Sequence, residues 1–165
     1  MPAWTAVIAP SARGVLGIDI NRETLEIAQA KPYPPARVSF EACDVQAALA
    51  KHCGCDGAFA GFWWSHIPRR ERRAFTASLC GALAPGAVVV VLDNRYVEGS
   101  STPIAQTDAD GNTFQKRRLD DGSEHLVLKN FPNEAELRGE LAGLASRVDY
   151  TALDYYWLLD FRTSD

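Results

Sequence analysis

Apolar residues in this chain gather in short blocks, and each block ends at a polar edge. The first block, residues 15–22, starts with apolar residues and breaks off at Asp19 and Asn21. A short apolar run with a polar end is typical of a strand that is buried on both faces, as in a parallel α/β sheet. Asn21 is a favourable N-cap, so the pattern predicts a helix directly after this strand.

The pattern recurs in three further blocks, at residues 37–44, 56–64 and 87–92. The block at 56–64 is almost entirely apolar, which predicts a central strand. Helical patterns lie between the blocks at 45–51 and 69–83, and residues 4–12 resemble the rear part of a helix. Strands that alternate with helices predict a parallel sheet with right-handed crossovers, and a binding rim along the edge where the strands end.

The pattern changes after Asn94. Residues 113–119 and 124–129 are polar, strand-like runs joined by a turn, which predicts a hairpin; residues 133–146 read as a helix; and 147–153 and 155–163 predict an antiparallel pair. We therefore predict one α/β domain over residues 1–165. It has a Rossmann-like, mostly parallel sheet flanked by helices, closed by a C-terminal antiparallel β-pair, with a loop and hairpin inserted at about 97–130.

Composition narrows the functional classes. The net charge of −4 argues against nucleic acid as a partner, since nucleic-acid binders usually carry a basic surface. No apolar run approaches the ~20 residues that span a bilayer, and the start lacks the features of a signal peptide. We expect a cytoplasmic protein with no membrane partner.

The cysteines predict neither disulfides nor a metal site. There are four, and their positions do not form the framework that small secreted domains use. Cys53 and Cys55 lie two residues apart, whereas structural zinc sites favour C-x₂₋₄-C spacing and a second pair of ligands. We expect free thiols and no metal.

Several side chains are suited to binding or catalysis. A carboxylate such as Asp19 at a strand end can accept hydrogen bonds from ribose hydroxyls, or it can cap the helix that follows. His66, just beyond the third block, can act as a general base or can cap the helix that begins near Arg69.

The acceptor-binding residues are expected near the same rim. Asn94, Arg95 and Tyr96 follow the last parallel strand and either bind a substrate or satisfy the strand end. Trp64 is the second residue of a Trp63–Trp64 pair, and adjacent strand residues point to opposite faces, so at most one indole faces a ligand. The arginine-rich run at 69–73 is interrupted by Glu71, which favours a solvated helix start over a nucleic-acid site.

Four segments in order resemble the class I S-adenosylmethionine-dependent methyltransferases: Gly17–Asn21, Ala42–Val45, Asp56–Ala60, and Leu83–Ala87 before a valine-rich strand. The resemblance implies S-adenosylmethionine as cofactor. It implies that Asp19 holds the ribose hydroxyls and that Asp44 accepts from the adenine amino group. It places Ile20 on the adenine ring and Asn21 and Val45 beside it, with Gly61, Phe62 and Trp63 along the methionine side.

The sequence departs from that family at its front. The family places a strand and a glycine-rich loop ahead of the helix at 4–9, and here Met1–Pro2 stands where that loop should end. We therefore expect an N-terminally truncated form of this family. Three explanations are open: the start is misassigned, a partner chain supplies the missing strand, or the chain is a shortened relative that has lost cofactor binding. Loss of a central strand leaves unpaired strand edges, which predicts a homodimer or larger homo-oligomer.

These observations lead to a specific functional expectation. We expect methyl transfer from S-adenosylmethionine to a small-molecule acceptor, by O- or N-methylation. An alternative is a non-catalytic methyltransferase-like domain that acts through self-association. A third reading is another nucleotide-binding α/β protein in which Asp19 binds ribose.

Overall fold

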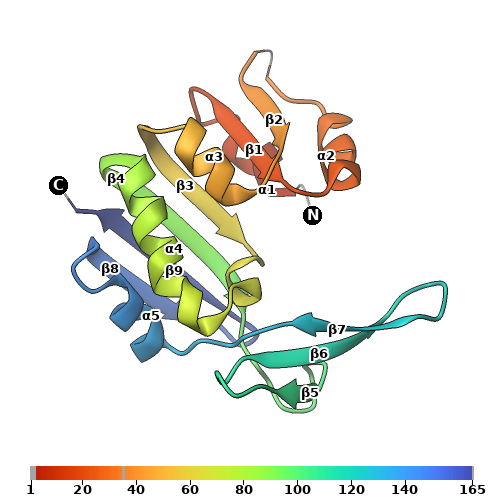
Figure 1. Cartoon of the computed structure of the whole chain (residues 1–165). Coiled ribbons are helices and arrows are strands. Elements are labelled where there is room, and N and C mark those ends of the chain that lie inside the picture. Colours follow the sequence, from red (N-terminus) through yellow and green to blue (C-terminus); the bar gives the residue numbers. More distant parts are fainter. Residues whose placement is uncertain (1–2, 35, 165) are drawn as a thin grey trace. The chain divides into compact units, whose positions relative to one another are not determined.

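A computed structural model describes residues 3–34 and 36–164 (Figure 1). Met1 and Pro2, where the resemblance places the end of a glycine-rich loop, lie outside the described residues. The chain divides into two compact units, residues 1–53 and 54–165, and each is described by itself.

The first unit is a small β-α-β arrangement with flanking helices. Its elements are α1 (Ala3–Ile8), β1 (Val15–Asp19), α2 (Arg22–Gln29), β2 (Val38–Ala42) and α3 (Val45–Lys51). The strands β1 and β2 pair in parallel, from Val15 opposite Val38 to Asp19 opposite Ala42. Helix α2 contacts both strands, and α1 and α3 contact β1. The strand–helix order predicted for this region is confirmed.

One glycine allows the two strands of this unit to pack closely. Gly17 pairs with Phe40 across the β1–β2 ladder. A Cβ atom built on Gly17 would meet the Cδ1 atom of the Phe40 ring at 2.6 Å, which is closer than packed carbon atoms approach. Gly17 therefore lets the Phe40 ring lie against β1, where it also contacts Tyr33 at a ring distance of 5.7 Å.

The second unit contains two sheets. Its elements are β3 (Cys55–Gly61), the 3₁₀ helix η1 (Trp64–His66), α4 (Arg69–Ala82), β4 (Leu83–Asn94), β5 (Ile104–Thr107), β6 (Thr113–Arg118), β7 (Glu124–Leu128), α5 (Glu134–Leu141), β8 (Ala145–Ala152) and β9 (Tyr156–Thr163). The main sheet has the order β3-β4-β9-β8, with β3 parallel to β4 and the other pairs antiparallel. The predicted C-terminal antiparallel pair is confirmed as β8 and β9.

The core of this unit lies on the main sheet. Val89 and Val91 of β4 and Leu159 and Phe161 of β9 are buried, and their side chains alternate with more exposed neighbours. Such alternation places one face of the two central strands against the helices α4 and α5. The sheet therefore has a continuous apolar layer along β4 and β9.

The prediction that residues 56–64 form a central strand is wrong. Within the described residues β3 pairs only with β4, so β3 is an edge strand of its sheet, and β4 has partners on both sides. The strand also ends at Gly61, and its first three residues are exposed. An apolar composition indicates that the faces of a strand are covered, but it does not show whether a neighbouring strand lies on each side.

The insertion forms a separate three-stranded antiparallel sheet with the order β5-β6-β7. The predicted hairpin is confirmed as β6 and β7, while β5 was not predicted because all four of its residues are exposed and no alternation marks it. Helix α5 ends at Leu141, earlier than predicted, since Gly143 adopts a left-handed conformation with φ +77°. A helix cannot continue through that backbone geometry.

Two further observations concern the whole described chain. In residues 3–34 and 36–164, no helix has both the length and the apolar character that crossing a bilayer requires. Cys43, Cys53, Cys55 and Cys80 are free thiols.

Candidate functional site

The rim of the first unit carries two carboxylates at adjacent strand ends. The Asp19 Oδ1 atom accepts a hydrogen bond from the Asn21 backbone N–H at 2.8 Å. Asn21, not Asp19, caps helix α2, since its Oδ1 accepts from the backbone N–H groups of Glu23 and Thr24. The alternative in which Asp19 caps this helix is therefore wrong, and the Asp19 side chain stands beside the cap.

Asp44 lies two residues beyond Ala42, the residue of β2 that pairs with Asp19. It is the N-cap of α3, and its Oδ1 atom accepts from the Gln46 backbone N–H at 2.8 Å. The Cys43 N–H donates to the Asp19 carbonyl at 3.2 Å, so the two strand ends lie side by side. Among the described residues, the Oδ2 atoms of both carboxylates accept no hydrogen bond, and each retains an acceptor for a ligand donor.

An apolar side chain stands at the same rim. Ile20, between Asp19 and the cap Asn21, is 75% exposed. Isoleucine side chains are usually buried, so an isoleucine exposed next to polar strand ends indicates a surface that a ligand can cover. The first unit thus presents hydrogen-bond acceptors and an apolar surface together, and Val45 begins the helix that Asp44 caps.

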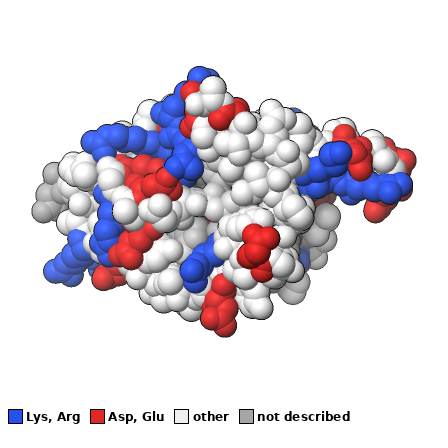
Figure 2. Space-filling view, turned by 90° about the horizontal axis from the view of Figure 1, so that it is seen from below, with Lys and Arg blue, Asp and Glu red and all other residues white. Residues whose placement is uncertain are grey.

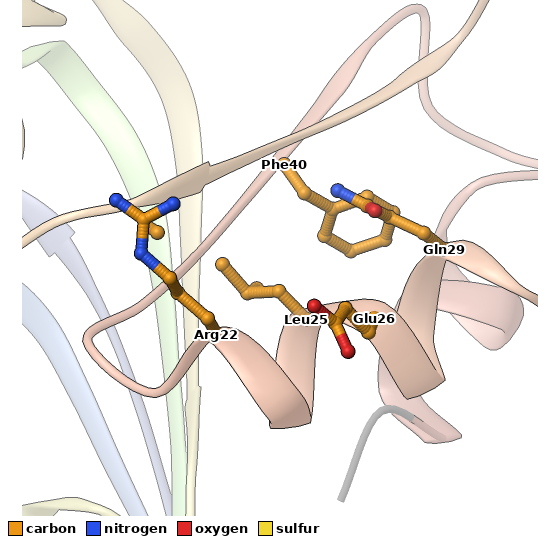
Figure 3. A pocket seen from close by; sticks show the side chains of 6 residues that line it. Arg22, Leu25, Glu26, Gln29 and Phe40 are labelled. Atoms are coloured by element: carbon orange, nitrogen blue, oxygen red, sulfur yellow. The ribbon is translucent and has the colours of Figure 1, made fainter.

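A shallow pocket in the first unit lies away from these residues. It has a volume of about 240 Å³ and is lined by Arg22, Leu25, Glu26 and Gln29 of α2 and by Phe40 and Ala42 of β2 (Figure 3). None of the predicted cofactor residues lines it. We assign it no role.

The turn after β3 in the second unit has a strained backbone. Phe62 follows Gly61 and has φ +59°, a left-handed conformation that side chains other than glycine seldom adopt. Its N–H donates to the Leu92 carbonyl at 2.8 Å, and its ring packs on Tyr156 with centroids 5.7 Å apart. Strain of this kind persists where the surroundings hold it, commonly at functional sites.

The two tryptophans after this turn differ in environment. Trp63 is 37% exposed, and Trp64 is 1% exposed. Both indoles pack edge-on against Phe75 of α4. A fully buried indole has no face open to a ligand, so Trp64 contributes to the core and not to the acceptor pocket predicted for it.

A buried ion pair ties η1 to the end of β4 and to the hairpin. Asp93 is fully buried and accepts from the Ser65 backbone N–H at 2.8 Å and from the Ser65 hydroxyl at 3.0 Å. The Lys129 Nζ atom donates to Asp93 Oδ1 at 3.0 Å and to Ser65 Oγ at 2.7 Å. Each of these buried polar groups has a partner, as a buried charge requires.

His66 has a defined tautomer. Its Nδ1 atom lies 2.7 Å from the Leu128 carbonyl oxygen. A carbonyl can only accept, so Nδ1 carries the proton, and the neutral ring keeps its lone pair on Nε2. Burial lowers the pKa of His66 below its ordinary 6.5, and the positive charge of Lys129 lowers it further. At neutral pH the ring is therefore uncharged and can accept a proton.

The alternative role of His66 as a helix cap is wrong. Helix α4 has Pro68 at its N-cap position and no side-chain cap. The Arg69 N–H donates instead to Asn112 Oδ1 at 2.8 Å. Asn130 donates to the same oxygen and to the Ile67 carbonyl, so two asparagines of the insertion satisfy the backbone at the start of α4.

These asparagines also fix the base of the hairpin. Asn130 is fully buried, and its Oδ1 atom accepts from the Thr113 N–H at 3.0 Å. Its own N–H donates to the Ser65 carbonyl. Asn112 is held by Asp108, whose hydrogen bonds with Asn112 lower the pKa of that carboxyl. The hairpin base is therefore fastened to η1 and α4 by buried hydrogen bonds.

The arginine-rich start of α4 is solvated in part, with one buried exception. Arg72 is 2% exposed and pairs with Glu140 at 2.9 Å; Arg69 pairs with Glu136, and Arg73 donates to the Gly139, Glu140 and Ala142 carbonyls. Arg70 and Arg73 are exposed, and the Arg70 Nη1 atom lies 3.2 Å from Asp110 Oδ2. The prediction of a solvated helix start is wrong at Arg72, whose buried ion pair with Glu140 fastens α4 to α5.

The charged side chains visible in Figure 2 are of both signs. Lys, Arg, Asp and Glu lie close together on the projecting β6–β7 hairpin, where Lys116 pairs with Glu124 at 3.1 Å. This face presents no continuous basic stripe of the kind that tracks a nucleic-acid backbone.

A larger cavity of about 430 Å³ opens at the carboxyl end of β4, wholly within the second unit. It is lined by Asn94, Arg95, Ser100, Ser101, Thr102, Gln115, Arg117, Lys129, Phe131, Tyr155 and Tyr156. The structure thus brings the predicted residues Asn94 and Arg95 together at one cavity. Tyr96 does not line it and packs on Phe131 with ring centroids 5.3 Å apart.

Solved structures share this fold. The structure titled DhpI–SAH complex matches with a TM-score of 0.73 and 24% sequence identity, over 98% of this chain and 71% of that chain. The DhpI–SAM–HEP complex matches with a TM-score of 0.72 and 25% identity, over 96% of this chain and 72% of that chain. A SAM-dependent methyltransferase from Methanosarcina mazei matches with a TM-score of 0.68 and 16% identity, over 96% and 85%.

This chain has the fold of the class I S-adenosylmethionine-dependent methyltransferases. The resemblance drawn from its sequence motifs is confirmed at the level of the fold. No protein-family model and no curated protein matches its sequence.

Three residues near the cavity in the second unit of this chain were not predicted as site residues. Ser65, Arg117 and Lys129 surround the end of β4 and His66, but in sequence Lys129 lies 36 residues after Asp93 and 64 after Ser65. The available signal was Lys129–Asn130, two polar residues directly after an apolar strand end. The apolar run before them marks a strand, and its polar end repeats the pattern of the four parallel strands.

Proposed function

We propose that this protein is a methyltransferase that uses S-adenosylmethionine and a small-molecule acceptor. The observation that carries the proposal is the rim of the first unit, with Asp19 and Asp44 at adjacent strand ends and the exposed Ile20 beside them, in a fold of this type. The solved relatives named above include complexes of DhpI with SAH and with SAM, which supports the cofactor assignment.

The donor set of this rim fits an adenosine moiety. Ribose hydroxyls and the adenine amino group are hydrogen-bond donors, and both carboxylates keep an acceptor oxygen for them. We assign Asp19 to the ribose hydroxyls, Asp44 to the amino group and Ile20 to the ring face, with Asn21 and Val45 holding the adjoining backbone. The methionine-side role of Gly61, Phe62 and Trp63 stays a prediction.

The second unit carries the acceptor chemistry. Bound S-adenosylmethionine would supply an electrophilic methyl group on a sulfonium. His66 receives the proton that a hydroxyl or protonated amine acceptor releases, on the Nε2 lone pair that the Leu128 carbonyl leaves available. Asn94 and Arg95 hold the acceptor at the cavity, because positioning provides much of the catalysis of an in-line displacement.

Calorimetric titration with S-adenosylhomocysteine tests the proposal. We expect micromolar affinity for the unmodified chain. Asp19→Asn keeps the acceptor for the Asn21 N–H and removes the charge, and we expect it to weaken binding about tenfold or more, since a hydrogen bond to a charged group contributes about 1.5–3 kcal/mol.

The matched control is Glu26→Gln, which removes one exposed carboxylate from the same unit away from the rim. It should leave the affinity within about twofold, as expected for an exposed charge with no ligand contact. Absence of binding in a folded sample would reject the cofactor assignment.

A specific observation also favours self-association. Among the described residues β1 and β2 pair only with each other and β3 only with β4, so each of these three parallel strands has an unpaired edge. Such edges are templates for pairing with another chain. We propose a homo-oligomer in solution. The homo-oligomer is either the assembled form of the methyltransferase or, in the alternative function, the means by which a non-catalytic domain acts. Light scattering measures the assembly.

A further inference from the structure

The cavity at the carboxyl end of β4 is rich in positive charge. Three of its lining side chains are cationic, namely Arg95, Arg117 and Lys129, and no lining residue is an aspartate or glutamate. Its remaining polar groups include the hydroxyl-bearing residues Ser100, Ser101 and Thr102. The volume of about 430 Å³ lies within the range typical of small-molecule sites.

Two of the three cations have no compensating carboxylate. Lys129 is paired with the buried Asp93 at 3.0 Å, and its charge is balanced there. Arg95 donates from Nη1 to the Leu153 carbonyl, which is neutral, and neither Arg95 nor Arg117 forms an ion pair within residues 3–34 and 36–164. The cavity therefore carries an excess of positive charge from two guanidinium groups.

We propose that this cavity binds the anionic group of an acidic methyl acceptor, held by Arg95 and Arg117. Guanidinium groups present several N–H donors in a planar fork, which matches the oxygens of a carboxylate or a phosphoryl group. The inference rests on the proposed methyltransferase function and adds the chemical class of the acceptor. A methyl acceptor that is a small acid satisfies both charges, while a neutral one leaves them uncompensated.

The aromatic side chains of the cavity suit the rest of such a molecule. Tyr156 and Phe131 line it, and each is packed by another ring, Tyr156 by Phe62 and Phe131 by Tyr96. Supported rings give an acceptor a fixed apolar wall at a low cost in side-chain entropy. The cavity thus combines a charged end with a rigid aromatic side.

The electrostatics at His66 are consistent with this assignment. The cations that lower the pKa of His66 include Lys129 and Arg117, both of which line the cavity. An anion that neutralises Arg117 relieves part of that effect, so His66 becomes a stronger base when an acidic acceptor is bound. Binding and proton acceptance are then favourably coupled.

Titration with inorganic phosphate and with acetate, followed by calorimetry or by amide chemical shifts, tests the proposal. We expect saturable binding of at least one of them at low ionic strength and no binding of acetamide, the neutral analogue of acetate. Tighter binding of phosphate assigns a phosphoryl group to the acceptor, and tighter binding of acetate assigns a carboxylate.

Arg117→Gln should weaken anion binding by about tenfold or more, the range expected when a charge-assisted hydrogen bond is lost. Arg118→Gln is the matched control, because adjacent residues of β6 point to opposite faces and Arg118 does not line the cavity. It should change the affinity less than about twofold, as for other exposed charges. Both residues are exposed, so both variants should fold.

The two proposals fail separately. If S-adenosylhomocysteine binds and neither anion does, the acidic acceptor is rejected and the methyltransferase stands. Equal binding of acetamide and acetate, or equal losses in the Arg117 and Arg118 variants, would also overturn the acidic acceptor. If S-adenosylhomocysteine does not bind but the anions do, the cofactor assignment is rejected and the anion site remains.

Discussion

A single main-chain carbonyl decides the chemistry available to His66. The Leu128 oxygen, 2.7 Å from Nδ1, fixes the proton on that nitrogen, while burial and nearby cations keep the ring neutral. A base that is already neutral at the working pH does not have to lose a proton before it accepts one. Leu128 lies 62 residues away in the chain, so this preference originates in the insertion.

The pH dependence of the reaction should report this environment. Because the pKa of His66 in the folded protein is below 6.5, the ring stays unprotonated from neutral pH down to that value. We expect kcat/KM for methyl transfer to be constant from pH 8 to 6.5 and to fall at lower pH as His66 is protonated. Initial rates over pH 5–8 measure the profile.

His66→Gln should reduce kcat by about 10² or more, the lower end of the usual contribution of a general base, and should remove the acidic limb. His125→Gln is the control, because His125 is an exposed histidine on the hairpin. An acidic limb that persists in His66→Gln would show that another group accepts the proton.

The sequence anticipated site residues unevenly. Asp19 ends β1 and Asp44 lies two residues after β2, so a short window of sequence is enough to place them at the rim. Lys129 and Arg117 lie near the end of β4 only because the insertion folds back against that strand. No local sequence pattern predicts this contact. Trp64 was misplaced for a related reason, since packing against Phe75 decides which indole is buried.

At the scale of elements, α4 and α5 are joined by a buried ion pair. Arg72 and Glu140 have side-chain exposures of 2% and 13%. Burial raises the pKa of Glu140 and lowers the pKa of Arg72, which shows that both charges are held against a desolvation penalty. A pair of this kind is worth little net stability while it is intact, but loss of one partner leaves a buried charge uncompensated.

A double-mutant cycle measures this dependence. We expect Arg72→Met and Glu140→Leu each to lower the free energy of unfolding by about 3–5 kcal/mol. The double variant should lose less than either single one, because no charge then remains buried. Urea unfolding of the four proteins gives the coupling energy.

The exposed pair Arg138–Glu134 offers a comparison on α5 itself. Its side chains are 45% and 48% exposed, so Arg138→Met should cost less than about 1 kcal/mol. Additive losses in the Arg72 and Glu140 cycle would show that the two side chains do not act as a pair.

Most elements were predictable because their signals are local. The N-cap Asn21 marked α2, and Asn133 with Glu136 marked the start of α5 through a capping box. Elements set by distant partners were not. Strand β5 exists only through its pairing with β6, and the edge position of β3 depends on which strands lie beside it.

At the scale of the whole molecule, the order of strands and helices along the chain was the main basis for predicting the fold. Strands that alternate with helices and a closing antiparallel pair were enough to indicate the fold that the solved methyltransferases share at 16–25% identity. The position of the insertion was also predicted. Its buried contacts with η1 and α4 were not, because they join segments distant in sequence.

The unpaired edges of β1 and β3 give the oligomer prediction its physical basis. Light scattering at micromolar concentration should report a mass of at least two chains, against 18.1 kDa for one. Ile18 on β1 is 37% exposed, and Ile18→Lys should shift the population toward the monomer, since lysine on an edge strand opposes pairing.

Val7→Lys is the control for that variant. Val7 is also exposed and apolar, but it lies on helix α1, which has no strand edge to offer. A monomer in the unmodified protein, or the same response from both lysine variants, would contradict assembly through the strand edges.

The way the hairpin is fastened has a consequence for how this protein diversifies. Asn112 and Asn130 hold its base, whereas the turn at Leu119–Ser123 is exposed except for the half-buried Ser123, and its hydrogen bonds join neighbouring residues of the hairpin. A segment anchored at its base tolerates changes of length and composition at its tip, as surface loops generally do. Under the proposed function, new acceptor preferences can therefore arise, by natural drift or by directed libraries, while the anchoring asparagines and His66 stay constant.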